Sequence, residues 1–125
     1  MNFNSTLNSE HLTGKEIALL GLSTAVNNAN QPLVIFFTNL AQKHEATKEE
    51  TAEAVSCASL LASNNVFYWF RHFTQKEKYM QIPVRIRMQI MVKPVPGKEF
   101  FELLSLAVSA INGCEMCVRP RGFPY

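Results

Sequence analysis

The apolar residues of this chain recur at helical spacing in four stretches that short polar segments separate. The first stretch follows Thr13, which together with Glu16 has the Thr-x-x-Glu pattern that caps the start of a helix, and it ends in the turn-favouring segment 27–30. Asn30 and Pro32 open the second stretch. Because that stretch is apolar on nearly all sides, we expect it to be buried on more than one side.

The third stretch begins at a second Thr-x-x-Glu pattern, Thr47 to Glu50, and predicts a long helix that ends near Phe73. Its first half is rich in alanine and serine, whose small side chains let another helix approach closely. Its second half concentrates aromatic side chains at 67–70, which we expect to lie in the core or at a subunit interface.

Segment 84–92 alternates apolar and polar residues, which is the period of a β-strand. No other stretch offers a strand to pair with it, and an isolated strand would leave its backbone groups unpaired. The resemblance described below implies a short helix and loops between 75 and 96 instead. We therefore predict an all-α fold.

The last apolar stretch starts at Lys98, runs through Phe100 and carries one acid, Glu102, which we expect to be buried. It stops at Asn112-Gly113, because both residue types tolerate the left-handed backbone that ends helices. Four polar residues of this stretch recur on one helical face, and they are Glu102, Ser105, Ser109 and Asn112. This polar seam is typical either of a helix interface lined by small polar groups or of a wet channel that leads from the acid toward the cysteines.

Cys-Glu-Met-Cys follows directly, at 114–117. A helical turn that begins at Cys114 sets both sulfur atoms on one face, at a separation compatible with a disulfide. A thiol at a helix N-terminus also meets the positive end of the helix dipole, which lowers its pKa. This favours the thiolate, the species that attacks peroxides and disulfides.

Composition narrows the class of protein. With 125 residues, 47% hydrophobic and 18% charged, the chain is long and apolar enough for one packed domain. A net charge of +2 gives no argument for a nucleic-acid partner. The polar first residues lack the apolar region of a signal peptide, and no apolar run approaches the ~20 residues that span a bilayer, so we expect no membrane partner. Three cysteines do not suit an extracellular disulfide scaffold, and we expect a cytoplasmic protein.

The last third, Phe-Glu-Leu-Leu-Ser-Leu-Ala-Val-Ser-Ala-Ile-Asn-Gly-Cys-Glu-Met-Cys-Val, resembles the AhpD-like branch of the carboxymuconolactone decarboxylase superfamily (alkyl hydroperoxide reductase D). The segment 64–73, then Tyr79, Arg87-Met88 and Pro96-Gly97, resembles the same family in order and spacing. The similarity covers about 20–118 and is dense from Asn64 onward. The spacing from the glutamate to the Cys-x-x-Cys makes it specific.

The resemblance implies an oligomeric helical bundle, a trimer or a hexamer, that acts as a thiol-dependent peroxidase. It implies that Cys117 attacks the peroxide, that Cys114 resolves the resulting sulfenic acid into a disulfide, and that Glu102 relays protons to the pair. It implies a dithiol reductant, such as a dihydrolipoamide-carrying partner protein. We expect no cofactor and no bound metal.

The chain departs from the family after Val118. Arg121 stands where the family has a relay histidine, and the last residues, Arg-Pro-Arg-Gly-Phe-Pro-Tyr, do not resemble the family. Arg119 and Arg121 could lower the pKa of a nearby thiolate or form a solvated basic tail. We therefore expect a polar lead at 1–13, a helical domain at 14–118 that is shortened at its C-terminus, and a divergent tail at 119–125.

Other interpretations remain open at this level. A helical oligomerisation module without catalysis would suit the missing histidine, and decarboxylation of a carboxymuconolactone-type substrate is a third possibility. A zinc site would need four ligands, from Cys57, Cys114, Cys117 and a histidine. We favour Cys57 as a buried apolar filler. For His72, a surface or partner contact is the more common role, and an approach to the cysteines is the alternative.

Overall fold

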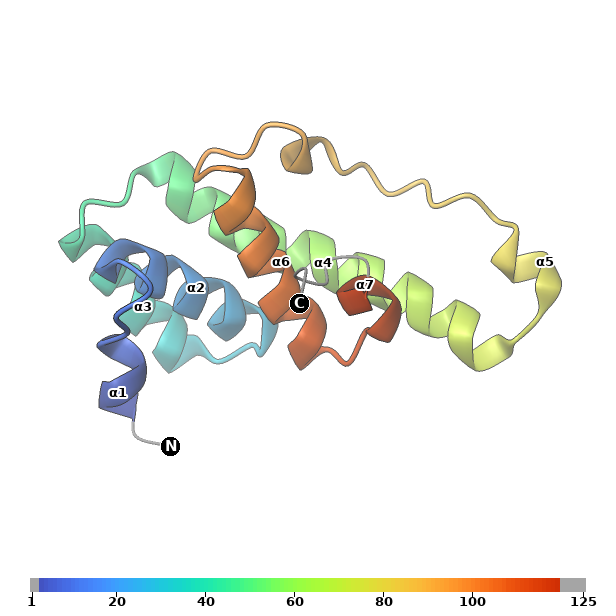
Figure 1. Ribbon diagram of the computed structural model, residues 1–125, viewed down its shortest axis with the longest axis horizontal. Helices are drawn as coiled ribbons and strands as arrows, with labels where there is room; N and C mark the ends of the chain where they lie inside the picture. Colours follow the sequence, from blue (N-terminus) through green and yellow to red (C-terminus); the bar gives the residue numbers. More distant parts are fainter. Residues whose placement is uncertain (1–2, 120–125) are drawn as a thin grey trace.

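The computed structural model describes residues 3–119, and all regular structure in that span is helical, as predicted (Figure 1). Within these residues no strand forms, so the all-α prediction is confirmed for them. The elements are α1 (Phe3–Leu7), α2 (Gly14–Asn27), α3 (Gln31–Lys43), α4 (Lys48–Thr74), α5 (Glu77–Met80), the 3₁₀ turn η1 (Gln89–Met91), α6 (Lys98–Ile111) and α7 (Glu115–Val118).

The predicted helix starts are present in atomic detail. Thr13 and Thr47 each accept a hydrogen bond from the backbone N–H three residues on, while Glu16 and Glu50 accept one from the capping residue's own N–H. These are the two predicted capping boxes, and each satisfies backbone donors that the first helical turn cannot. At α3, the side chain of Asn30 accepts from the backbone N–H of Leu33.

The core lies where α2, α4 and α6 meet. Its largest fully buried side chains come from these three helices. They include Leu19, Leu22, Leu61, Phe101, Leu104 and Val108. The small residues Ala54 and Ala58 are also buried, which is how the alanine-rich half of α4 admits its neighbours. Together with α3, these helices form what we call the bundle.

Helix α3 is buried on one side only, which corrects the expectation of burial on several. Phe37 and Ala41 face α2, where a Cβ added to Gly21 would overlap the ring of Phe37. On the other side Ile35 is 55% exposed and Phe36 40% exposed. The apolar residues on the outer side of this helix are therefore only partly covered by the rest of the described chain.

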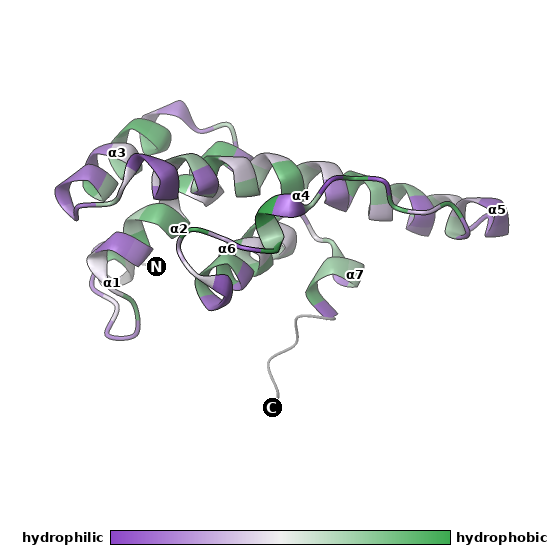
Figure 2. Cartoon of the chain, turned by 90° about the horizontal axis from the view of Figure 1, so that it is seen from above, coloured by the Kyte–Doolittle hydropathy of each residue, from purple (hydrophilic) through white to green (hydrophobic). Residues whose placement is uncertain are grey.

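Residues 66–97, which we call the arm, extend from the bundle (Figure 1). The second half of α4 runs out to α5, and the chain then returns along α4 to the start of α6. No residue of the arm is buried. The aromatic block at 67–70 is therefore not core in this chain, and hydrophobic and hydrophilic residues alternate along the ribbon of the arm (Figure 2).

The returning segment explains the strand-like pattern. From 84 to 90 the chain is extended or in a 3₁₀ turn, and exposure alternates residue by residue, with Val84, Ile86 and Met88 half-buried and Arg85 and Arg87 exposed. The period of two is real, but it belongs to an extended chain with one side turned inward rather than to a paired strand. Farther on, the backbone N–H of Val95 donates to Glu53 Oε2 at 2.9 Å, which ties the return to the bundle.

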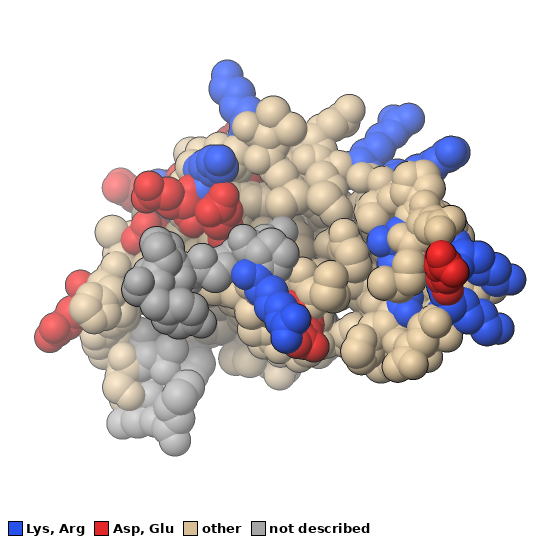
Figure 3. All heavy atoms as spheres, turned by 45° about the vertical axis from the view of Figure 1, so that its right-hand side comes forward, with Lys and Arg blue, Asp and Glu red and all other residues tan. Residues whose placement is uncertain are grey.

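Charge is divided between the two parts. Residues 71–93 hold six of the 12 lysines and arginines and one of the 10 acids. Figure 3 shows mostly basic groups over the arm and acidic groups gathered on the opposite side of the view. No helix within residues 3–119 combines the length and apolar character that crossing a bilayer requires.

Candidate redox site

The end of α6 sets the position of the first cysteine. Gly113 adopts a left-handed backbone with φ of 67°. Its N–H donates to the carbonyl of Ala110, and the N–H of Cys114 donates to the carbonyl of Ser109. These two bonds form a Schellman motif, which a glycine stabilises because it has no Cβ to clash. The chain therefore turns sharply after Asn112 and begins α7 at the cysteines, as the sequence predicted.

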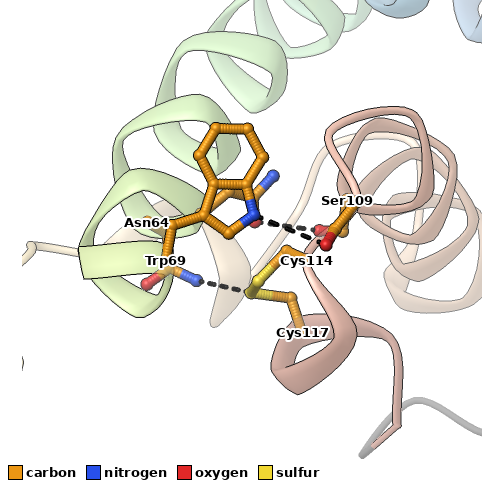
Figure 4. The surroundings of a disulfide bond; sticks show 7 residues. Asn64, Trp69, Ser109, Cys114 and Cys117 are labelled. Carbon is orange, nitrogen blue, oxygen red and sulfur yellow. Dashed lines mark hydrogen bonds between the residues drawn. A yellow bond between two sulfur atoms is a disulfide. The ribbon is translucent and has the colours of Figure 1, made fainter. Parts of the chain in front are cut away.

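Cys114 and Cys117 form a disulfide at the start of α7, with their Cα atoms 5.3 Å apart (Figure 4). Cys114 is 1% exposed and Cys117 is 6% exposed. The predicted proximity of the two sulfur atoms is therefore present in the fold. Cys57 is buried in the bundle as expected, and its Sγ lies 3.7 Å from Ser105 Oγ.

One face of α4 holds this segment in place. Asn64 Nδ2 donates to Cys117 Sγ at 3.7 Å, and Trp69 Nε1 donates to the carbonyl of Gly113 at 3.4 Å (Figure 4). Between them, Ser109 Oγ donates to Asn65 Oδ1 at 3.3 Å. The cysteine turn and the end of α6 are thus attached to the same side of α4.

Asn64 and Asn65 are the site residues that sequence reasoning missed. The sequence patterns gave this pair no role in the site, yet both are buried, at 4% and 0% exposure. Among residues 3–119, neither Asn64 Oδ1 nor Asn65 Nδ2 has a hydrogen-bond partner. Two adjacent amides in an otherwise apolar helix face are expensive to bury unless they bind something. The cost of burying these two adjacent amides was the signal that could have marked the pair as site residues.

A cleft of about 170 Å³ adjoins the disulfide. The exposed end of α4 forms one wall and the cysteine turn forms the other. Its lining residues are Tyr68, Trp69, His72, Phe73, Gly113, Cys114, Glu115 and Met116. His72 is exposed, as favoured, and it also lines the cleft that Cys114 borders, which agrees with the alternative.

Glu102 is exposed on α6, which corrects the expectation that this acid is buried. Within the described residues no hydrogen bond joins it to either cysteine. The buried acid is instead Glu53 on α4, which is 6% exposed. A lone acid in an apolar helix can face solvent whenever it falls on the outer side, and the linear pattern of α6 did not fix that side.

The rest of the polar seam lies between helices. Ser105 contacts Cys57, Ser109 contacts Asn65, and Asn112 exchanges two hydrogen bonds with Asn27, at 2.8 and 3.0 Å. Each side chain has a partner on α2 or α4, which agrees with the helix-interface interpretation of the seam. Hydrogen bonding of this kind offsets the desolvation of the buried hydroxyls and amides.

At the far end of the site, Arg119 forms an ion pair with Glu115 at 2.6 Å, both on the exposed side of α7. Arg121 lies outside the described residues. Within 3–119, no group of three or more histidines, cysteines or acids is placed to hold a metal ion.

Fold and site together define a protein that is helical in its described residues and carries a Cys-x-x-Cys disulfide against α4. No family model matches the chain. Curated relatives do match, under the name alkyl hydroperoxide reductase AhpD. The protein of Anaeromyxobacter sp. (strain K) is 38% identical over 119 residues, covering 95% of this chain and 63% of the relative. That of Coxiella burnetii (strain Dugway 5J108-111) is 38% identical over 112 residues, covering 88% and 62%.

A third relative, from Rhodopseudomonas palustris (strain BisB18), is 37% identical over 118 residues, covering 94% of this chain and 65% of its own length. The chain is therefore an AhpD-like protein, as its motifs indicated. It spans less than two thirds of the length of these relatives.

Proposed function

We propose that this chain is a thiol-dependent peroxidase and disulfide oxidoreductase of antioxidant defence, acting in the cytoplasm and cycling Cys114 and Cys117 between dithiol and disulfide. The observation that carries the proposal is the disulfide between these two residues at the start of α7. The curated name of the relatives, alkyl hydroperoxide reductase AhpD, supports the same class.

The oxidative half of the cycle needs two thiolates and two protons. The Cys117 thiolate attacks the outer oxygen of a hydroperoxide, the O–O bond breaks, and the leaving alkoxide takes a proton to become an alcohol. Cys117 is then a sulfenic acid. The Cys114 thiolate attacks its sulfur, hydroxide leaves and is protonated to water, and the disulfide forms.

The remaining half returns two electrons to the pair. A dithiol, such as dihydrolipoamide on a partner protein, reduces the disulfide and becomes a disulfide itself. In this proposal Glu102 supplies the protons that the leaving alkoxide and hydroxide require. Its exposure on α6 lets it exchange those protons with water.

Counting thiols tests the redox role. Reduced protein treated with one equivalent of hydroperoxide should lose two thiols per chain, and peptide mapping should place both at 114 and 117. Cys117→Ser should lose none, whereas Cys57→Ala, which alters a cysteine buried in the bundle, should still lose two. Glu102→Gln should slow the loss about 10²-fold or more without changing its extent. No loss in the wild type would refute the proposal.

The second candidate function is assembly without catalysis. The observation that favours it is the apolar surface of the arm, where Val66, Phe70 and Phe73 are 57%, 49% and 74% exposed. Side chains of this size at the surface are typical of a subunit interface. We propose that the arm contributes to a homo-oligomer, a trimer or a hexamer. A well-formed oligomer with only background peroxide turnover would select this candidate over the first.

A further inference from the structure

The two sulfur atoms of the disulfide have unequal surroundings. Cys117 Sγ accepts a hydrogen bond from Asn64 Nδ2 at 3.7 Å, and no other side-chain donor among the described residues contacts it. Neither disulfide sulfur carries a hydrogen, so only the N–H face of the Asn64 amide can bind there. Cys114 Sγ has no such side-chain donor within residues 3–119. The amide thus distinguishes one end of the bond from the other.

We propose that Asn64 is a catalytic residue that stabilises negative charge on Cys117 Sγ, so that a thiol reductant attacks Cys114 and Cys117 departs as the thiolate. This inference rests on the proposed function, because it takes the cysteine pair to be redox-active. It assigns the stabilisation of charge on Cys117 Sγ to Asn64, and not to either cysteine or to Glu102.

The chemistry follows from the hydrogen bond. A donor that contacts a sulfur binds it more strongly once the sulfur is charged, so the N–H of Asn64 lowers the pKa of the Cys117 thiol. In thiol–disulfide exchange the thiol of lower pKa leaves faster. The attacking thiolate therefore bonds to Cys114 Sγ, the S–S bond breaks, and its electron pair goes to Cys117 Sγ. The second thiol of the reductant then displaces Cys114, leaving a dithiol protein and an oxidised reductant.

The position of the cleft beside the disulfide agrees with attack on Cys114. Cys114 belongs to its lining and Cys117 does not. The aromatic side chains of Tyr68, Trp69 and Phe73 surround the approach, and they suit the aliphatic body of a small dithiol. Although Cys114 is 1% exposed and Cys117 is 6% exposed, the cleft borders Cys114, so a reductant held there would lie beside Cys114.

The carbonyl oxygen of the Asn64 side chain suggests a part for this residue in the oxidative step as well. Asn64 is 4% exposed, and its Oδ1 has no hydrogen-bond partner among the described residues. A buried acceptor without a partner is costly to keep. Once Cys117 is a sulfenic acid, its O–H is a donor on the same sulfur that the Asn64 N–H contacts. The same amide would then hold the intermediate until Cys114 condenses with it.

The test compares two adjacent amides. Asn64→Leu removes the contact with Cys117, whereas Asn65→Leu alters an equally buried amide that bonds Ser109 instead. Iodoacetamide alkylation of the reduced proteins across pH, with peptide mapping, gives the pKa of the Cys117 thiol. We expect Asn64→Leu to raise that pKa by about one unit and to lower the alkylation rate of Cys117 at neutral pH by up to about tenfold. Asn65→Leu should destabilise the fold but leave that pKa in place.

A second experiment measures which of the two cysteines a thiol attacks. Oxidised wild-type protein is mixed briefly with 2-mercaptoethanol, quenched in acid and mapped by mass spectrometry. The mixed disulfide should lie on Cys114, and its formation should be up to about tenfold slower in Asn64→Leu. An adduct mainly on Cys117, or an unchanged thiol pKa in Asn64→Leu, would overturn the inference. Neither measurement uses a peroxide, so failure of peroxide turnover would count against the proposed function and not against this assignment.

Discussion

The bundle and the arm share helix α4, and they use its two halves in opposite ways. Up to Asn65 the helix turns seven buried residues inward, among them two alanines, one leucine and two asparagines, while its serines lie on the exposed side. From Val66 onward it presents aromatic side chains, and none is buried. The cysteine turn is attached where one half gives way to the other, by Asn64 bonded to Cys117 and Trp69 bonded to the carbonyl of Gly113.

This contrast separates residues that hold the chain together from those that face outward. The bundle is stabilised by apolar side chains that the chain itself removes from water. The arm leaves large apolar side chains exposed to water, and this exposure adds nothing to the stability of a single chain. The arm also carries six of the 12 basic residues of the chain within 71–93. We therefore expect mutations in the bundle to change the free energy of unfolding and mutations in the arm to change association.

Two phenylalanines give the largest contrast. Phe101 in the bundle is 2% exposed and Phe73 in the arm is 74% exposed. Phe101→Ala should lower the free energy of unfolding by about 3–5 kcal/mol, because it removes buried contacts and leaves a cavity. Phe73→Ala should change it by less than about 0.5 kcal/mol in dilute monomer. Urea denaturation at low protein concentration measures both.

The same pair of variants tests assembly. Sedimentation at micromolar concentration should show that Phe73→Ala weakens the proposed oligomer while it leaves the monomer intact. Equal losses of monomer stability in the two variants would contradict the division into bundle and arm. A wild-type protein that stays monomeric at high concentration would show that the apolar arm is not an interface.

Local patterns were enough to predict the helices, because their signals lie within a few residues of one another. Thr13 with Glu16, Thr47 with Glu50, and Asn112 with Gly113 each determine a helix end through contacts three to five residues apart. The pairing of Cys114 with Cys117 is local in the same sense.

What the sequence did not reveal depends on contacts between distant segments. Glu102 was expected inside, and the side of α6 that faces the core decides that it is outside. Asn64 reaches Cys117 across 53 positions of sequence, and Glu53 reaches Val95 across 42. The alternation at 84–92 has the period of a strand, and the short helix and loops expected between 75 and 96 formed instead, as α5, η1 and the coil around them.

Helix caps give a second, smaller contrast. Thr47 caps α4 in the bundle with a side-chain hydrogen bond to Glu50, whereas Lys76 precedes α5 in the arm without one. Thr47→Ala should therefore lower the free energy of unfolding by about 1 kcal/mol. Lys76→Ala should change it by less than about 0.5 kcal/mol. Thermal or urea denaturation of the pair checks this, and a larger loss in Lys76→Ala would mean that α5 contributes to the cooperative fold.

The smallest effect concerns acid stability of the bundle. Partial burial by itself would raise the pKa of Glu50, but hydrogen bonds from the Thr47 backbone and from Lys15, together with the charge of Lys15, leave that pKa below its usual value. The Lys15 Nζ to Glu50 Oε1 distance is 2.9 Å, and the Glu50 side chain is 12% exposed. Because the pKa is lowered on folding, the ionised carboxylate stabilises the fold above the usual pKa of 4.5, and this contribution is lost as pH falls through the lower folded value.

Glu50→Gln keeps a side chain that can complete the capping box and removes the charge. At neutral pH it should lower the free energy of unfolding by about 0.5 kcal/mol, and the difference from wild type should shrink as pH falls through the lowered pKa of Glu50. Glu16→Gln is the matched control, because Glu16 completes the other capping box and forms no ion pair within residues 3–119. It should lose less at neutral pH. Urea denaturation between pH 3 and 7 measures both series, and a Glu50→Gln difference that grew in acid would reverse the sign argued here.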